Sequence, residues 1–148
     1  MGGFYSLSRS NVALSTTNDH LTILPAATRT FDLIETSVGG MGTASAANEL
    51  QVARSSGGTG GGGAVTAQPL REAQAAAGFT NFTTWAMQPT LGPVLLRLPV
   101  NANGGIYRWV RPPGQVITFI AGNTNPQLSF RSAVGTSSVS FHAIIEEF

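Results

Sequence analysis

The chain contains no cysteine, so it can form neither a disulfide framework nor a thiolate metal site. It also contains no lysine, and all eight basic residues are arginine. Without lysine there is no phosphate loop of the Walker type, no Schiff-base chemistry and no lysine general base. The arginine usage fits either a compositional bias of the source genome or a role for arginine in fixed contacts between subunits.

Charged residues are scarce, at 10% of the chain against about 25% in an ordinary soluble domain. A surface built mainly from small and uncharged polar residues repels its own copies weakly, which suits a chain that neighbours cover. The net charge is +1 and the arginines are dispersed, so we expect no nucleic-acid partner. No apolar run approaches the roughly 20 residues of a membrane span, and no secretion signal is visible, so we expect no membrane association.

The length of 148 residues predicts one domain, residues 1–148, that buries roughly 70% of the surface its unfolded chain exposes. The last third of the chain alternates apolar and polar residues in short runs separated by Gly, Pro and Asn. Between Val139 and Ile145 every second side chain is apolar, which is typical of a strand with one wet face. The alternating runs 96–100 and 107–111, with a turn at 101–105, predict a hairpin.

The N-terminal half favours strands as well. Residues 31–38 form its clearest strand, which Gly39 and Gly40 are expected to break, and a second strand is expected within residues 44–54. Residues 79–87 return to a strand pattern. The sequence therefore predicts an all-β protein, an antiparallel β-sandwich.

Three segments stand apart from this pattern. Residues 1–11 predict an N-terminal arm or an edge strand. The Gly-rich stretch at 55–65 predicts a flexible exposed loop; it has dinucleotide-fingerprint spacing, but lacks the strand before it and the helix after it that a nucleotide site needs. Residues 69–77, with Pro69 at the start and Gly78 after the end, predict the one short helix of the chain.

Candidate catalytic and metal-binding residues are few. The two histidines, His20 and His142, lie near opposite ends of the chain, without the spacing of a metal site. A Ser-His-Asp arrangement lacks the Gly-x-Ser-x-Gly elbow that would support it. Glu146 and Glu147 fit a solvated tail. We therefore expect no catalytic residue, no metal, no cofactor and no enzyme activity, and an enzyme would require activity that depends on one of the histidines.

Asp32 and Glu35 are the other acidic pair that sequence reasoning considers. They are expected on opposite faces of one strand, where their carboxylates do not converge.

Aromatic residues offer an alternative function. Trp85, Tyr107 and Trp109 could stack on sugar rings, which would make the chain a carbohydrate- or receptor-binding module. Aromatic side chains of this kind also fill the core of a small sandwich, and the sequence leaves both interpretations open.

Several segments resemble the small auxiliary head proteins of tailed bacteriophages, the cement or decoration proteins of the capsid. The likeness spans most of the chain as a pattern, and its segments are residues 31–35 with the following Gly-Gly, 52–54, the Gly-rich loop, 82–85 before 89–91, 105–110 leading into 113–114, and 128–132.

The resemblance implies a jelly-roll sandwich that forms homo-oligomers, with a trimer favoured, and binds the major capsid protein. Such a protein is made in the host cytoplasm and ends up on the outer capsid surface of the virion, where it bridges neighbouring capsid subunits. The expected contact elements are the arm at 1–10 and the loop at 55–63. The residues singled out for capsid or subunit contact are Phe4, Tyr5, Arg9, Gly58, Gly60 and Gly63.

Overall fold

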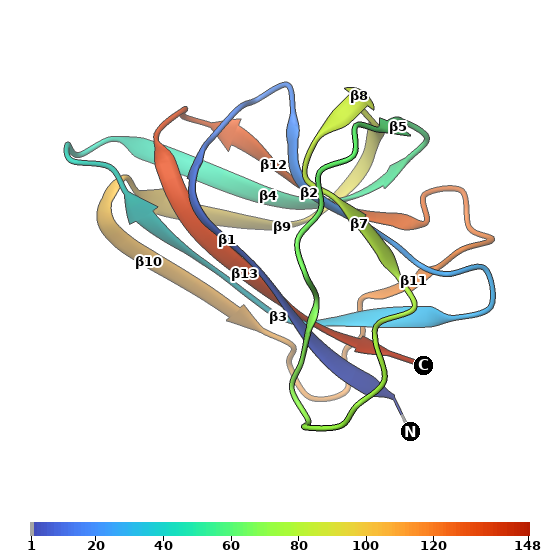
Figure 1. Ribbon diagram of the computed structural model, residues 1–148. Helices are drawn as coiled ribbons and strands as arrows, with labels where there is room; N and C mark the ends of the chain where they lie inside the picture. The colour runs from blue at the N-terminus through green and yellow to red at the C-terminus, as the bar shows by residue number, and fades with distance from the viewer. Residues whose placement is uncertain (1) are drawn as a thin grey trace.

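The computed structural model describes residues 2–148, which form strands and no helix, and therefore none that could cross a membrane. Two antiparallel sheets pack face to face as a sandwich (Figure 1). The strands are β1 (Gly3–Ala13), β2 (Asp19–Leu24), β3 (Thr30–Met41), β4 (Ala47–Ser56), β5 (Thr59–Gly60), β6 (Gln68–Pro69), β7 (Thr80–Phe82), β8 (Trp85–Met87), β9 (Thr90–Asn101), β10 (Asn103–Val110), β11 (Thr118–Ile120), β12 (Gln127–Val134) and β13 (Ser138–Glu147).

The order of the strands is that of a jelly roll. Sheet A runs β10-β3-β13-β1-β6, with β11 extending the β10 side of β3, and sheet B runs β7-β2-β12-β4-β9. The chain crosses between the sheets at β1 to β2, β2 to β3, β3 to β4, β9 to β10, β11 to β12 and β12 to β13, so each sheet collects strands from both halves of the sequence. Without the short strands β6, β7 and β11, the orders β10-β3-β13-β1 and β2-β12-β4-β9 are those of the two four-stranded sheets of a jelly roll. The predicted all-β antiparallel sandwich is confirmed.

The core lies between the two sheets and consists of aliphatic and phenylalanine side chains. Strand β13 alternates buried and partly exposed residues along its whole length, as the sequence predicts. The rings of Phe31 and Phe119 stack with centroids 4.9 Å apart, and those of Phe130 and Phe141 at 5.3 Å. These pairs join distant parts of the chain across the core.

The predicted hairpin between β9 and β10 is wrong. Strand β9 pairs with β4 in sheet B, whereas β10 pairs with β3 in sheet A, so residues 101–105 carry the chain from one sheet to the other. The crossing is held by the neighbouring crossing between β3 and β4: the Ala102 N–H donates to Ala46 O, and the Gly42 N–H donates to Ala102 O. A short polar turn between two alternating runs fits either geometry, and only the partner strands decide between them.

The predicted break at Gly39 and Gly40 is also wrong, because β3 continues through both to Met41. The two glycines differ in what surrounds them. A Cβ on Gly40 would lie 2.0 Å from Asn101 O and 2.5 Å from Ala102 O, while one on Gly39 would have nothing closer than Gly105 O at 3.9 Å. Gly40 therefore lets the crossing backbone lie directly against β3.

The predicted helix at residues 69–77 does not form. Gln68 and Pro69 instead form β6, which pairs with β1, and Ala73 has a φ of 62°, which no right-handed helix accommodates. The Leu70 N–H donates to Phe4 O and the Tyr5 hydroxyl donates to Ala75 O. These bonds to β1 replace the i to i−4 bonds that a helix of this length would make.

The N-terminal residues do not form a projecting arm. From Gly3 to Ala13 they form β1, which lies between β13 and the two-residue strand β6 inside sheet A. A bulge between Arg9 and Val12 bends this strand, and Asn11 within it has a φ of 51°. The alternative in the sequence prediction, a strand near a sheet edge, is closer to what the structure shows.

Residues 57–89 form a long insertion between β4 and β9, which we call the cover segment. It contributes β7 to the edge of sheet B and β6 to the edge of sheet A, and it folds back on itself where β5 pairs with β8 (Figure 1, green). The predicted single strand at 79–87 is therefore two strands with different partners. Phe79 enters the core and meets Tyr5 edge-on, with ring centroids 5.5 Å apart. The cover segment thus closes the β1 and β2 side of the sandwich.

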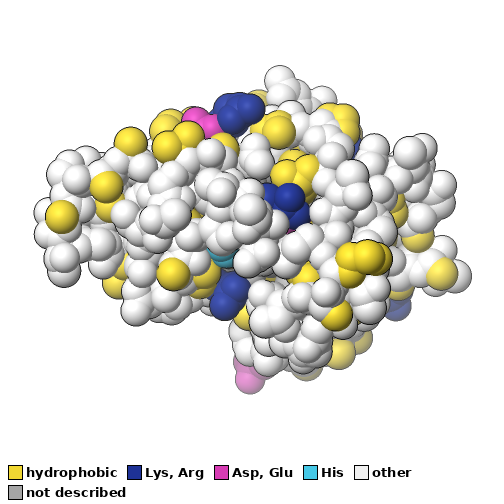
Figure 2. All heavy atoms as spheres, turned by 90° about the horizontal axis from the view of Figure 1, so that it is seen from above, with side chains coloured by type: hydrophobic (Ala, Val, Ile, Leu, Met, Phe, Trp, Pro, Cys, Tyr) yellow, Lys and Arg dark blue, Asp and Glu magenta, His cyan; other side chains and the backbone are white. Residues whose placement is uncertain are grey.

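The surface is mostly uncharged, as the composition predicts. On the face shown in Figure 2, charged side chains form small isolated spots among uncharged polar groups and backbone, with separate hydrophobic patches. No large field of one sign is visible on this face.

Replacing Gly40 with Ala is expected to lower the free energy of unfolding by about 1–3 kcal/mol, because backbone atoms of the crossing would have to move. The matched control is Gly39→Ala on the adjacent residue, where a methyl group meets only ordinary contacts and the change is within about 0.5 kcal/mol. Chemical denaturation of both variants measures the difference. Equal stabilities would show that the crossing does not press on β3.

Candidate functional site

The outward face of sheet A carries partly exposed side chains on β10, β3, β13 and β1, and we call it the open face. Its side chains stand in rows across β10, β3, β13 and β1, which the strand register aligns. One row contains Ile106, Gly39 and Ser140, and the next contains Arg108, Ser37, His142 and Ser8.

A shallow hollow of about 380 Å³ lies where these rows meet. Gly39 contributes no side chain to it, and four of the ten surrounding residues are serines. The residues around the hollow are Ser8, Arg9, Ser10, Ser37, Val38, Gly39, Ile106, Ser140, Phe141 and His142. The open face therefore carries mostly short side chains and few charges at this point.

An ion pair crosses the open face beside the hollow. The Arg108 guanidinium donates from Nε and Nη2 to the two oxygens of Glu35, each at 2.7 Å. The hydrogen bond from Arg108 is the main reason that the pKa of Glu35 lies below its ordinary value, with a smaller contribution from His142. Because Arg108 is well exposed, the pair fixes the position of the arginine more than it stabilises the fold.

His142 links this ion pair to a serine. Its Nε2 lies 3.3 Å from Glu35 Oε1 and its Nδ1 lies 2.8 Å from Ser37 Oγ. A serine, an imidazole and a carboxylate in sequence have the composition of a nucleophilic triad, but acyl transfer also needs donors for an oxyanion. Strand β3 is paired on both sides around Ser37, which engages its backbone N–H groups in the sheet. We therefore interpret the chain of contacts as a cross-strand tie.

The two carboxylates of β3, Asp32 and Glu35, both face outward, contrary to the expectation of opposite faces. The β3–β13 register shifts between them, so that Asp32 lies opposite Glu146 and Glu35 opposite Ile144. Each has its own arginine, because Asp32 Oδ2 accepts from Arg111 at 3.1 Å. The two carboxylates remain separate ion pairs.

The cover segment lies over the β2 side of the outward face of sheet B, and a buried polar network lies beneath it. Farther along the same face, Arg97 of β9 stays exposed. Asp19 is at its centre: the carboxylate accepts hydrogen bonds from Thr22 Oγ1 at 2.7 Å, Ser129 Oγ at 2.5 Å and Arg131 Nε at 2.6 Å. Ser55 extends the network through its contact of 2.6 Å with Ser129 Oγ. Every one of these hydroxyls is fully buried although it points away from the core.

Three hydrogen bonds attach the cover segment to this network. The Asp19 N–H donates to Gln88 Oε1, Arg131 donates to Pro89 O, and Gln127 donates to Gly57 O. The bonds hold both ends of the segment, at Gly57 and at 88–89. Burying an aspartate with an arginine stabilises a structure only when the remaining polar atoms also find partners, as they do here.

The glycines of the expected contact loop lie against the aromatic side chains of the cover segment itself. A Cβ on Gly60 would lie 2.3 Å from the Phe82 ring, and one on Gly58 would lie 2.9 Å from the Trp85 ring. Gly63 is equally close to the hydroxyls of Thr83 and Thr84. The predicted free loop is therefore a packed element, and its glycines allow close approach within the chain.

The expected contact residues of the N-terminus divide between two environments. Tyr5 is buried in the core, and its hydroxyl is bonded to Ala75 O, so it is not available to a partner. Phe4 lies on the outward side of β1, and Arg9 lies at the hollow, where its Nη1 donates to His20 O at 2.6 Å. Of the six residues singled out from the sequence, Phe4 thus lies on the open face, whereas Arg9 lies opposite the core residue Phe141 and reaches sheet B.

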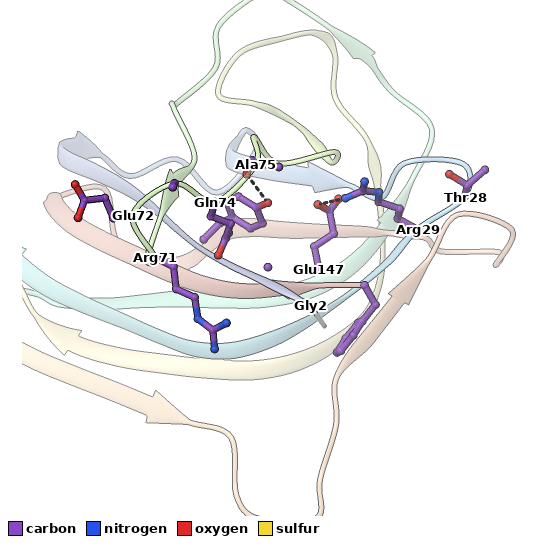
Figure 3. Close-up of a pocket in the computed structure, with 12 residues that line it drawn as sticks. Gly2, Thr28, Arg29, Arg71, Glu72, Gln74, Ala75 and Glu147 are labelled. Atoms are coloured by element: carbon purple, nitrogen blue, oxygen red, sulfur yellow. Dashed lines mark hydrogen bonds and ion pairs between the residues drawn. The ribbon is translucent and has the colours of Figure 1, made fainter.

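A second hollow, of about 690 Å³, lies at the end of the sandwich where the two termini meet (Figure 3). Glu147 forms one side of it and is buried, contrary to the expectation of a solvated tail. Its Oε2 accepts from Arg29 at 3.1 Å and from the Gly78 N–H at 2.9 Å, whereas its Oε1 is sealed from solvent without a partner. The carboxylate therefore fastens the cover segment to β13 at Gly78, within the segment.

The histidine near the N-terminus, His20, is also structural. Its Nε2 accepts a hydrogen bond from the Ser15 N–H at 3.0 Å, which requires the neutral ring. Burial is the main reason that the pKa of His20 lies below its ordinary value. Among residues 2–148, no three His, Cys, Asp or Glu side chains gather as they would to hold a metal ion.

The three aromatic residues of the sugar-binding alternative do not share a surface. Trp85 lies in β8 against Phe82, with ring centroids 5.0 Å apart, while Tyr107 and Trp109 lie in β10. Figure 1 shows β8 and β10 on opposite sides of the sandwich. Trp109 packs against the core.

No protein-family model, no curated protein and no solved structure matches this chain.

Replacing Asp19 with Asn is expected to lower the free energy of unfolding by about 3–5 kcal/mol, because Arg131 would stay buried without its counter-charge. Hydrogen exchange should also quicken in residues 57–89, which the network holds. The control is Glu49→Gln, which breaks the more exposed Arg97 pair on the same sheet and costs less than about 1 kcal/mol. Similar losses for both variants would contradict the role given to the buried network.

Acid should weaken the fold through His20. Its pKa is lower in the folded protein than in the unfolded chain, so its stabilising contribution is complete above about 6.5 and declines as the pH falls through the folded value. The variant His20→Gln keeps an acceptor for Ser15 and does not titrate. As the pH is lowered, the wild type should therefore lose more free energy of unfolding than the variant does. A difference in stability that does not depend on pH would contradict this role of His20.

Proposed function

We propose that this chain is a structural virion protein that binds the outside of a phage capsid and stabilises it by bridging neighbouring capsid subunits. The observation that carries the proposal is the contrast between the two sheets. The cover segment, residues 57–89, lies over the β2 side of sheet B and one side of the sandwich, whereas side chains of β10, β3, β13 and β1 on the open face stay partly exposed. A strand face that the chain itself leaves uncovered is well suited to a protein partner.

The chemistry of the open face supports a protein partner more than a small molecule. Its hollow is shallow, four of the ten residues around it are serines, and Ile106 projects at the rim, 82% exposed. Pockets for small ligands are concave enough to bury most of the ligand surface. Small side chains on a sheet instead allow another backbone or a flat surface to approach closely.

Binding would act by mass action. A protein that binds only the assembled shell stabilises it by its own binding free energy, which is about 2.7 kcal/mol per site when its concentration is 100 times the Kd. Many sites on one particle multiply this effect. Because the open face has few unpaired charges, the association should depend only weakly on salt.

The major capsid protein is the proposed partner, and the outer surface of the virion is the proposed location after synthesis in the host cytoplasm. The trimer suggested by the resemblance remains an expectation about oligomer order. Because the aromatic residues are separated, nothing in the geometry favours the carbohydrate-binding alternative.

The proposal predicts that particles purified from the source material contain this chain in a simple ratio to the most abundant shell protein, measured by quantitative mass spectrometry. Particles stripped of it should then rebind the recombinant protein. The variant Ser8→Arg, which places a long charged side chain on the open face, should weaken rebinding by roughly tenfold or more.

The control for this experiment is Thr59→Arg in β5, an equally polar, exposed position on the opposite side of the sandwich. It should rebind like the wild type. Absence of the chain from particles, or weaker binding by Thr59→Arg but not by Ser8→Arg, would rule out capsid binding through the open face.

A further inference from the structure

Strand β10 is the long unpaired edge of sheet A. It pairs with β3 along one side, and no other strand of residues 2–148 pairs with its second side. Eight residues of backbone therefore present hydrogen-bonding groups to solvent, in the geometry of a sheet.

The other sheet edges carry features that block further pairing. Strands β6 and β7 are two and three residues long, and β6 contains Pro69. Strand β9 is long but contains Pro93 and Pro99, and its ladder with β4 shifts register twice. Proline and irregular pairing are the usual means by which an edge strand avoids a partner.

Strand β10 is longer than β6 and β7, and its ladder with β3 is regular from Ile106 to Val110, with one register shift before that stretch, between Asn103 and Ile106. Residues 103–110 contain no proline and no lysine, and the one charge, on Arg108, is already paired with Glu35. The strand exposes apolar side chains on both faces: Ile106 and Val110 (46% exposed) outward, and Tyr107 (38% exposed) on the other face. An unblocked apolar edge of this length predicts association with another strand.

We propose that β10 pairs in antiparallel fashion with β10 of a second copy of this chain, joining the two A sheets into one continuous sheet. A second copy fits this edge because the strand is complementary to itself. When two copies are related by a two-fold axis, the free backbone N–H and C=O groups of each β10 form hydrogen bonds with those of the other. Each copy also covers the exposed apolar side chains of the other.

The side chains select the register. Opposite residues in an antiparallel ladder point to the same face of the sheet. A two-fold axis perpendicular to the sheet must therefore lie where a residue faces its own copy, because an axis between two residues would pair side chains of opposite faces. An axis at Arg108 would set the two arginines directly against each other, which is destabilising. An axis at Tyr107 pairs tyrosine with tyrosine and Ile106 with Arg108 of the second copy, and it keeps residues 104–110 of both copies within β10.

This geometry also fixes the direction of the open faces. Because the axis is perpendicular to the joined sheet, the open faces of both copies point to the same side. If the open face binds the capsid as proposed, one dimer would present two binding faces to the shell and so bridge two of its subunits. Only this consequence rests on the proposed function.

The absence of cysteine makes the register directly testable in the full-length protein. At an axis through residue 107, the two Cα atoms of Tyr107→Cys would lie about 5 Å apart, within the range of a disulfide. Those of Ile106→Cys would lie about 8 Å apart, beyond that range. Mild oxidation with copper phenanthroline should therefore crosslink Tyr107→Cys into a dimer, while Ile106→Cys and the exposed loop variant Val116→Cys stay monomeric on a denaturing gel.

Sedimentation equilibrium provides a second measurement without oxidation and without particles. The wild type should dimerise reversibly, and Ile106→Lys should raise the dimer Kd by about tenfold or more, whereas the matched change Val116→Lys should not. A wild type that stays monomeric, a trimer, equal effects of the two lysines, or crosslinking at residue 106 in preference to 107 would each overturn the proposal. These outcomes are independent of whether the protein binds a capsid.

Discussion

The buried aspartate of sheet B is the constraint on which the arrangement of the molecule depends. Asp19 and Arg131 lie on the outward face of β2 and β12, where an antiparallel sheet would ordinarily meet water. They are buried because the cover segment lies over them, and the cover segment is held in turn because its end at 88–89 bonds to the same two residues and Gly57 at its start bonds to Gln127. Neither the ion pair nor the segment would be stable alone, since a buried charge without its partners costs several kcal/mol.

This mutual dependence leaves the two sheets unequal. The β2 side of sheet B is covered on both faces, so residues 19–23 of β2 and 127–130 of β12 are buried, whereas Arg97 of β9 stays exposed. Sheet A is covered by the core on one face, so β13 alternates between buried and partly exposed residues. The polar ties on the open face, from Arg108 through Glu35 to His142 and Ser37, hold β10, β3 and β13 in register without covering them.

The alternation of β13 and the strand at 31–38 could be predicted because hydrophobic period is a local property of the sequence. The hairpin at 101–105 could not, because whether a polar turn reverses the chain within one sheet or crosses to another depends on strands far away in the sequence, β3 and β4. The helix at 69–77 failed for the same reason: its backbone groups bond to β1, which is about 65 residues away. Local propensity is overridden wherever distant strands compete for the same backbone groups.

The candidate site shows the same limit. Phe4 and Arg9 were singled out because an N-terminal arm was expected, and only Phe4 lies on the outward side of sheet A. The open face itself was missed, since Ser8, Ser37, Gly39 and Ser140 are unremarkable residues that only the strand register brings together. Likewise, a Gly-rich stretch is compatible both with a free loop and with a tightly packed one. Here the rings of Phe82 and Trp85, which lie against Gly60 and Gly58, show that the loop is packed.

The account centres on the claim that the open face is covered in the assembled particle and the cover segment is not. Single cysteines introduced at Ser140 and at Thr59 report on the two sides separately, because the chain has no cysteine of its own. Their rates of maleimide labelling should be compared in the isolated protein and in the particle-bound protein. The account predicts that labelling at 140 slows strongly on binding while labelling at 59 is unchanged; protection at 59 with continued labelling at 140 would contradict it.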